Sequence, residues 1–324
     1  MDNKYLVITI DVEEDNWGEF NLSHYTTKNI ERIPRLQKLF DTYNVKPTYL
    51  LSYPVASDDR AISIFNDILK TGNCEIGTHL HPWNTPPLVE ERNERNSMLG
   101  NLPSELQFQK INTLHNTIRK NLNILPISFR GGRWSFTNSI STIIHKLGYK
   151  VDTSIMAYTD RRHVHGPNFS GCSPFPYKFS VNDIFKPIPD GDLFELPATI
   201  GFLQTNSEIL RILNSFCSIY PFRLINAQRL FKRLNFMNKV SLSPEMNDGQ
   251  TMIELTENLE KWGQRFFNMF FHSTSLLTGL SPFTKTVDDE KRIVQYLAEY
   301  LQYAKNRGFK FITLSDTLRY FTIS

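Results

Sequence analysis

The chain has 324 residues, a net charge of +3 and a hydrophobic fraction of 40%. The nearly balanced charge gives no electrostatic reason to expect nucleic acid as the main partner, and a chain of this length buries roughly 75% of its unfolded surface, enough for a core without covalent staples. Three widely spaced cysteines, Cys74, Cys172 and Cys217, form no Cys-x-x-Cys pair and indicate free thiols in a reducing compartment.

The first predicted element is the apolar run "YLVITI", which ends in carboxylates. It is too short for the apolar core of a signal peptide and reads as a β-strand. No apolar run reaches the roughly 18 residues of a membrane span. We therefore expect a cytoplasmic protein without a transmembrane segment.

Short apolar runs then alternate with helical patterns along most of the chain. Strands are expected at 5–11, 46–52, 74–81, 127–130, 150–155, 266–272 and 310–314. Helices are expected at 28–43, 59–70, 104–122, 140–147 and from Thr286 to Gly308, the last two ending at glycines. This order predicts an α/β fold with a mainly parallel sheet, open or closed into a barrel.

Two segments break the alternation within what we expect to be a single domain, 1–324. Residues 156–192 are rich in Pro, Gly and Ser and are predicted to form a long loop at the active-site face. Residues 203–250 are predicted to be a helical insertion, basic and amphipathic. The insertion is either an extra helical layer or a lid for a phosphate-bearing or lipid-linked substrate. Its basic residues are Arg211, Arg223, Arg229, Lys232, Arg233 and Lys239.

Polar side chains follow the first and third predicted strands. In "TIDVEED", strand alternation puts Asp11 and Glu13 on one face, at the carboxyl end where α/β folds place their sites. The alternative is a solvated acidic loop. In "GTHLHPW", His79 and His81 also share a face. Two imidazoles and a carboxylate suit an open zinc site, although a lone histidine is more often structural. Trp83 could form a wall for a sugar ring.

Three later strands end in charged or titratable residues. Arg130 emerges from an apolar strand, where an unpaired guanidinium would be costly, so we expect a carboxylate partner rather than a surface position. Gly131 and Gly132 would let the backbone approach closely. Asp152 could orient Arg130 or a ligand, or cap its turn. His272 ends a strongly apolar strand, either presented to a site or hydrogen-bonded to the core backbone.

Together these strand ends resemble the polysaccharide deacetylases, the NodB-homology family of metal-dependent sugar N-deacetylases. The resemblance covers about 5–320, apart from 203–250. It is carried by "TIDVEED", "EIGTHLHPW", "FRGGRW", "GYKVDTS" and "FHSTSL", which look like the five family motifs, and by the connecting segments "ELPATIGF" and "FITLSDTLRYF". It implies a distorted, incomplete (β/α) barrel of about seven strands.

The sequence departs from the family pattern at two motifs and looks like a divergent branch. The family's T-F-D-D is replaced by Asp11-Val12-Glu13-Glu14. Glu13 is then the expected metal carboxylate and Glu14 the alternative. The family's H-[ST]-x-x-H shrinks to His79-Leu80-His81, with Trp at position 83. His79 aligns with the first ligand, and His81 is inferred from proximity.

The resemblance also implies a mechanism. A divalent metal, expected to be Zn²⁺, is held by Glu13, His79 and His81 and activates a water. Asp11 is the catalytic base, Arg130 holds it ionised, and His272 is the acid that protonates the departing amine. The expected substrate contacts are Trp83, Arg133, Trp134 and Asp152.

The implied reaction is removal of an N-acyl group, expected to be acetyl, from an amino sugar during surface-glycan synthesis. The sugar could be free, nucleotide-linked, lipid-linked or part of a glycan. Two alternatives remain open. One is another C–N hydrolase on the same fold, a deformylase or cyclic amidase. The other is a catalytically silent member that binds glycan.

Overall fold

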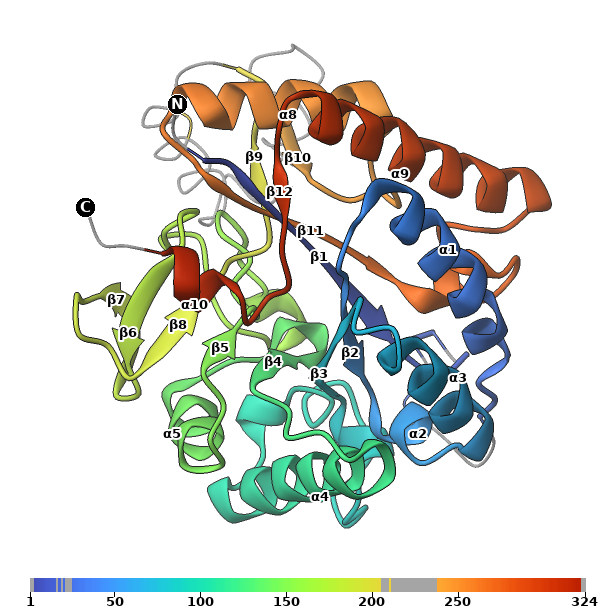
Figure 1. Cartoon of the computed structure of the whole chain (residues 1–324). Helices are drawn as coiled ribbons and strands as arrows, with labels where there is room; N and C mark the ends of the chain where they lie inside the picture. Colours follow the sequence, from blue (N-terminus) through green and yellow to red (C-terminus); the bar gives the residue numbers. More distant parts are fainter. Residues whose placement is uncertain are drawn as a thin grey trace.

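The centre of the molecule is a sheet in which seven strands run parallel, in the order β11, β1, β2, β3, β4, β5 and β8 (Figure 1). The computed structural model describes residues 3–15, 17–18, 20, 25–204, 210 and 238–321. β12 (Lys310–Phe311) pairs with the start of β1. The seven strands are β11 (Phe266–His272), β1 (Tyr5–Val12), β2 (Thr48–Leu51), β3 (Glu75–Leu80), β4 (Ser128–Gly131), β5 (Val151–Asp152) and β8 (Leu193–Glu195).

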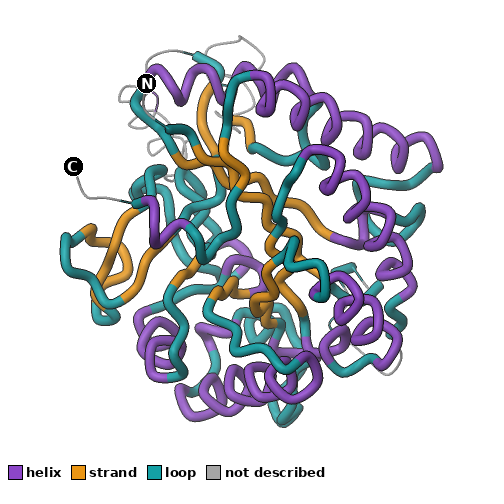
Figure 2. The backbone as a smooth tube through the Cα atoms, viewed as in Figure 1, coloured by secondary structure: helices purple, strands orange, loops and turns teal. Residues whose placement is uncertain are grey.

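Helices lie around most of this sheet, while the end that carries β8 lies at the left edge of the view (Figure 2). The α-helices are α1 (Ile33–Tyr43), α2 (Tyr53–Ala56), α3 (Asp59–Leu69), α4 (Ser104–Leu122), α5 (Asn138–Lys146), α8 (Gly249–Lys261), α9 (Val287–Asn306) and α10 (Thr317–Tyr320). Short 3₁₀ helices span Lys28–Arg32, Pro82–Asn84, Leu99–Asn101, Gly132–Trp134, Arg162–Val164 and Ser273–Leu276. Among the described residues, no helix combines the length and apolarity that crossing a membrane requires.

The two faces of β1 pack into different surroundings. Ile8 and Ile10 belong to the large apolar core that lies against the helices. Tyr5 and Val7 belong to a smaller apolar cluster with residues of β5, β8 and β11, on the opposite face. The strand is buried along its whole length, as expected for a strand covered on both faces. Asp11 continues the second face at the carboxyl end of the strand. It therefore lies above this smaller apolar cluster, which we call the apolar plug.

The sheet is open rather than closed into a barrel. In the part of the chain that the structure describes, no strand ladder joins β8 to β11. Single hydrogen bonds span the gap: the Thr199 amide donates to the Asn268 carbonyl, Leu242 to Thr199, and Phe270 to Leu242. The expected incomplete barrel of about seven strands is therefore confirmed.

The predicted loop at 156–192 is partly wrong. It contains β6 (Tyr177–Ser180) and β7 (Asp183–Pro187), which form an antiparallel hairpin. β6 pairs in turn with the edge strand β8. The alternation of buried Tyr177 and Phe179 with half-buried neighbours is a strand pattern, which the Pro, Gly and Ser content around it obscured.

The insertion predicted at 203–250 falls mostly outside the described residues, and so do five of its basic residues, Arg211, Arg223, Arg229, Lys232 and Arg233. Its structure and its proposed role as a lid therefore stay predictions. The described end of the range contains β10 (Lys239–Ser241), which pairs with β9 (Ile200–Phe202). It also contains the buried Leu242, so this part belongs to the core.

Candidate active site

Strand register brings residues that are distant in the sequence to one edge of the sheet. Asp11 on β1 lies opposite His272 on β11, and His79 on β3 lies opposite Arg130 on β4. In a parallel sheet the carboxyl ends of all strands meet on the same side. Four of the predicted site residues therefore converge through pairing of the strands alone.

Asp11 is bound by the fully buried guanidinium of Arg130. Arg130 Nη1 donates to Asp11 Oδ1 at 2.7 Å. The rest of the guanidinium is held by a polar layer beneath the site, with Nε donating to the Thr153 carbonyl at 3.0 Å and Nη2 to Thr9 Oγ1 at 2.7 Å. A buried arginine is tolerated when its charge is paired and its donors are satisfied. Asp11 is therefore the carboxylate partner that the sequence predicted for Arg130.

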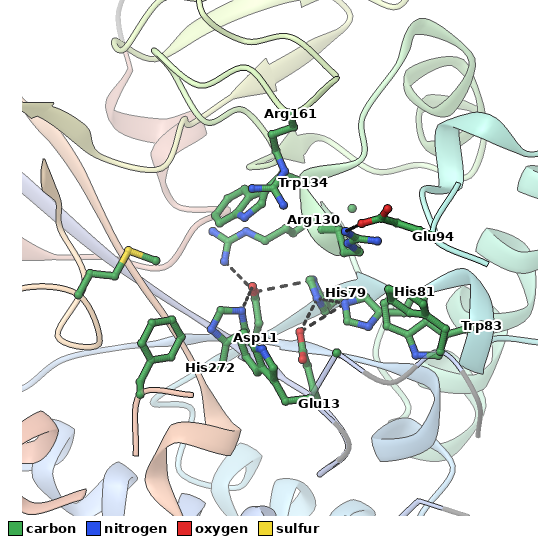
Figure 3. A pocket seen from close by; sticks show the side chains of 17 residues that line it. Asp11, Glu13, His79, His81, Trp83, Glu94, Arg130, Trp134, Arg161 and His272 are labelled. Carbon is green, nitrogen blue, oxygen red and sulfur yellow. Dashed lines mark hydrogen bonds and ion pairs between the residues drawn. The ribbon is translucent and has the colours of Figure 1, made fainter. Parts of the chain in front are cut away.

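Glu13, His79 and His81 form a compact buried cluster (Figure 3). Glu13 Oε1 lies 2.8 Å from His79 Nε2 and 3.4 Å from His81 Nε2, and the two Nε2 atoms are 2.8 Å apart. Burial lowers the pKa of His81 to about 3, so its imidazole is neutral. Burial alone would raise the pKa of Glu13, but His81 and His79 outweigh it and lower that pKa to about 2. The cluster thus offers one carboxylate and a neutral imidazole nitrogen beside a second imidazole, donors that could hold a divalent ion.

Glu14 faces a different environment. Its Oε1 accepts a hydrogen bond from Asn84 at 2.8 Å, and its Oε2 accepts one from Ser52 at 3.3 Å. Burial and the charge of Glu13 raise the pKa of Glu14 to about 7. Because Glu14 is outside the cluster of His79 and His81, the geometry favours Glu13 as the carboxylate ligand.

Gly132 makes room for His81. A Cβ at position 132 would overlap the His81 ring and lie 2.5 Å from the Leu80 carbonyl oxygen. The predicted close approach of backbone at this glycine is therefore confirmed. The His81 ring also packs against Trp83, with 4.1 Å between the ring centroids. His81 therefore contacts both a glycine that leaves room for it and an aromatic ring.

His272 lies across Asp11 from the histidine pair and is bound by a buried carboxylate, Glu245. His272 Nδ1 is 3.0 Å from Glu245 Oε2, and Nε2 is 3.7 Å from Asp11 Oδ2. Glu245 also accepts from the His272 amide at 3.0 Å and from the Ser275 hydroxyl. Burial alone would lower the pKa of His272, but Glu245 outweighs it and raises that pKa to about 9. His272 is therefore protonated at neutral pH.

These groups open into a pocket of about 540 Å³. Trp134 lies half-buried in its lining, with the Arg130 guanidinium carbon 4.9 Å from the ring centroid. Trp83 also lines the pocket, but it is almost fully buried and mainly supports His81. The lining comprises Asp11, Glu13, Trp17, Gly18, Phe20, His79, His81, Trp83, Glu94, Arg130, Gly131, Arg133, Trp134, Arg161, Met246, His272 and Phe283.

Asp152 is not among the residues that line this pocket. Its side chain is fully buried, and it accepts hydrogen bonds from the Ser154 amide and hydroxyl, both at 2.8 Å. It also lies beside Glu195, and burial raises its pKa to about 6. The structure therefore favours the alternative prediction, in which Asp152 caps its turn, over a contact with substrate.

Sequence reasoning missed three charged residues of the site, which are Glu245, Arg161 and Glu94. Glu245 lies within the range predicted as an insertion, and only three-dimensional packing brings it to His272. Arg161 lies in the loop after β5 and reaches the pocket from above (Figure 3). Glu245 stands in the stretch "SPEMNDG", but nothing in the spacing of this stretch pointed to His272, 27 residues later.

Comparison with known proteins gives one sequence relative and several structural ones. No family model matches the chain. A peptidoglycan deacetylase of Helicobacter pylori (strain ATCC 700392 / 26695) is 25% identical over 197 residues, which cover 58% of this chain and 60% of the relative. The chain thus matches about 60% of the length of this curated relative.

Solved structures share the fold. A candidate polysaccharide deacetylase from Mycobacterium smegmatis matches with a TM-score of 0.55 and 15% identity, over 98% of this chain and 91% of its own. A candidate glycoside hydrolase/deacetylase from Parabacteroides distasonis matches with a TM-score of 0.63 and 11% identity, over 97% and 70%. A 4-alpha-glucanotransferase from Thermococcus litoralis also matches, with a TM-score of 0.56 and 14% identity, over 99% and 41%.

The glucanotransferase shows that this fold alone does not fix one activity, so the site has to carry the functional argument. The resemblance predicted from the strand-end motifs is confirmed in sequence by the deacetylase and in fold by the solved structures. The chain is similar in sequence to a peptidoglycan deacetylase and has the NodB-type fold of polysaccharide deacetylases.

Proposed function

We propose that the protein is a metal-dependent hydrolase that removes an N-acyl group, expected to be acetyl, from an amino sugar. One observation carries the proposal. Asp11 is held by Arg130 on one side and faces a protonated histidine, His272, on the other, within one pocket. A base and an acid that flank one reacting carbon are what hydrolysis of an amide requires. The similarity to a peptidoglycan deacetylase supports the same reaction class.

The cluster of Glu13, His79 and His81 fits a divalent ion. Both Nδ1 atoms are buried without a hydrogen-bond partner among the described residues, while both Nε2 atoms face one carboxylate oxygen. Two imidazoles and one carboxylate leave an open coordination position, as in catalytic zinc sites. We infer Zn²⁺ as the ion. Bound there, it would supply a Lewis acid for water and for the acyl oxygen.

Asp11 and His272 carry out the proton transfers of the proposed reaction. Asp11 Oδ2 faces the pocket side near His272 and takes a proton from the attacking water, while Arg130 keeps the carboxylate in place. Water adds to the acyl carbon, and the C–N bond then breaks. His272, protonated on Nε2 and bound to Glu245 through Nδ1, gives its proton to the departing amine. The products are a carboxylic acid and a free amino sugar.

Trp134 supports a sugar as the substrate. Its half-buried ring is a wall of the pocket, next to the reacting groups, and aromatic faces are suited to pyranose rings. We propose surface-glycan synthesis as the context and the cytoplasm as the location. The sugar form, whether free, nucleotide-linked, lipid-linked or within a glycan, belongs to this proposal.

Two other functions stay open as alternatives. A deformylase or cyclic amidase on the same fold would use the same base, acid and metal cluster. A silent glycan-binding protein would not need the Asp11–Arg130 pair or the protonated His272.

The test is release of acetate from N-acetylated hexosamines by wild-type protein and by Asp11→Asn. Loss of the base should lower turnover by about 10²–10⁴-fold, while bound metal stays unchanged, because the ligands are intact. Release of formate in place of acetate, or opening of a cyclic amide, would favour the alternative of a deformylase or cyclic amidase. Equal turnover by Asp11→Asn would contradict the role assigned to Asp11.

A further inference from the structure

Two arginines of the pocket lining lie outside the cluster of Glu13, His79 and His81. Arg133 follows β4, and Arg161 lies in the loop after β5; both line the pocket. Figure 3 shows Arg161 extending toward Trp134 from the opposite side to Asp11. Arg133 is only 18% exposed, and Arg161 is half-buried. Two guanidinium groups are thus partly removed from water beside the proposed sugar-binding wall.

The nearby acidic groups do not neutralise both arginines. Glu94 lies 3.6 Å from Arg133 Nη2 and is 49% exposed, so it is a loose partner. Among the described residues, no hydrogen bond or ion pair reaches the Arg161 guanidinium, and its Nε is buried without a partner. Burial and the neighbouring Arg133 lower the pKa of Arg161 to about 10. The site therefore holds a partly desolvated positive charge that lacks an anion.

The remaining pocket acids are already engaged. Asp11 is paired with Arg130, and Glu13 with the two histidines. The arginine next in sequence, Arg162, is paired with Asp160 at 2.8 Å and is 63% exposed, outside the pocket lining. The unpaired charge of Arg161 is thus a feature of the pocket rather than of the whole loop.

The backbone holds Arg133 and Trp134 in an uncommon conformation. Their φ angles are +54° and +62°, in the left-handed region that most side chains avoid. Such backbone positions are strained for residues other than glycine and tend to occur where a side chain must face a ligand. The turn directs one cation and one aromatic face toward the same space.

We propose that Arg133 and Arg161 form an anion-binding subsite that receives a phosphate or carboxylate group on the sugar while its ring lies on Trp134. This inference rests on the proposed function and specifies its substrate class, an acidic amino sugar. Guanidinium groups bind both anions through paired N–H donors, and binding would satisfy the Nε that is now unpartnered.

The test measures binding by calorimetry with sugars that carry no acyl group, so that no turnover occurs. Glucose, glucose 1-phosphate and glucuronic acid offer one ring with no anion, a phosphate or a carboxylate. Wild-type protein should bind at least one of the charged sugars at least tenfold more tightly than glucose. Whether glucose 1-phosphate or glucuronic acid gains more identifies which anion the subsite takes.

Variants then locate the subsite. Arg161→Gln should remove most of the preference for the charged sugar, and Arg161→Lys should keep part of it, because a positive charge remains. Arg162→Gln is the matched control: it removes one positive charge from the same loop and should change nothing. Thermal unfolding of each variant checks that the fold is kept.

The results separate this inference from the proposed function. Equal binding of neutral and charged sugars by the wild-type protein would overturn the subsite even if acetate is released from a neutral N-acetyl sugar. Equal loss in Arg161→Gln and Arg162→Gln would overturn it too, because the effect would then be one of net charge. A preference for charged sugars that depends on Arg161, without any deacylation, would keep the subsite and remove the proposed reaction.

Discussion

At the scale of single residues, two similar carboxylates have different neighbours. Asp11 and Glu13 are two positions apart on one strand end and are both buried. Asp11 contacts a guanidinium and faces His272, which suits a base, while Glu13 contacts two imidazoles, which suits a metal ligand. Different environments of this kind commonly set the roles of paired carboxylates in enzymes. Strand alternation predicted their shared face, but only the contacts distinguish them.

Glu245→Gln should change the pH dependence of turnover. The Glu245 carboxylate keeps His272 protonated up to about pH 9, because it raises the pKa of the imidazole against the effect of burial. An acid is lost as the pH rises through its pKa. The variant should therefore lose activity at a lower pH than the wild-type protein, with about a tenfold or larger deficit at pH 8. The measurement is the pH profile of kcat, with metal content as the control.

An unchanged alkaline limb in Glu245→Gln would mean that Glu245 only supports the fold around His272. A loss of kcat by the same factor at every pH would lead to the same conclusion. Removing a purely structural contact does not shift the pKa that the pH profile reports.

At the scale of elements, the carboxyl ends of the strands carry the site, and the turns after them set its shape. The positions of most strands and helices could be predicted from apolar periodicity and helix caps; Thr286, for example, caps α9 through a capping box with Asp289. The β6–β7 hairpin could not be predicted, because its alternation of buried and more exposed residues is short and lies among turn-forming residues. The close approach at Gly132 could be predicted as a feature, but not its partner, His81.

Gly132→Ala should weaken metal binding and also lower the stability of the fold, because the added Cβ would lie 2.5 Å from the Leu80 carbonyl oxygen. The added methyl group would overlap the His81 ring, so the imidazole would have to move away from Glu13. We expect at least a tenfold rise in the dissociation constant for the metal, since displacement of one ligand removes a coordinate bond. Gly171→Ala is the control, because a Cβ there meets no atom within 4 Å. Equal metal affinities for the two variants would contradict this explanation.

At the scale of the whole molecule, a polar layer separates an apolar plug from the active site. Thr9, Arg130 and Thr153 lie directly beneath the pocket and are joined by hydrogen bonds. The sequence indicated that a buried arginine needed a partner, and the parallel sheet implied where it would be. The sequence could not indicate Glu245, because its contact with His272 joins a loop and a strand end that only tertiary packing brings together.

A second buried carboxyl pair, Asp152 and Glu195, should make the stability of the protein depend on pH. Burial raises the pKa of both groups, that of Asp152 to about 6. The folded state then binds a proton that the unfolded chain releases, so the free energy of unfolding decreases as the pH rises from about 4 through about 6. Glu195→Gln should make this decrease smaller, because one of the two carboxyl groups that hold the proton is then gone.

The measurement is denaturant unfolding of the wild-type protein and Glu195→Gln at several pH values between 4 and 8. The exposed Glu91→Gln serves as the charge-matched control, because its position is open to solvent. If the pH dependence is the same in all three proteins, the carboxyl pair does not store a proton in the folded state.

The central claim is that Glu13, His79 and His81 hold a catalytic metal ion, and the most direct measurement is the metal content of the purified protein beside Glu13→Gln and Glu14→Gln. Both substitutions remove a buried carboxylate from neighbouring positions, but only Glu13 faces the histidines. The wild-type protein and Glu14→Gln should contain about one divalent ion per chain, and Glu13→Gln should have lost it while remaining folded. A wild-type protein that takes up no metal from added Zn²⁺, or a Glu13→Gln variant that keeps its metal, would contradict the account.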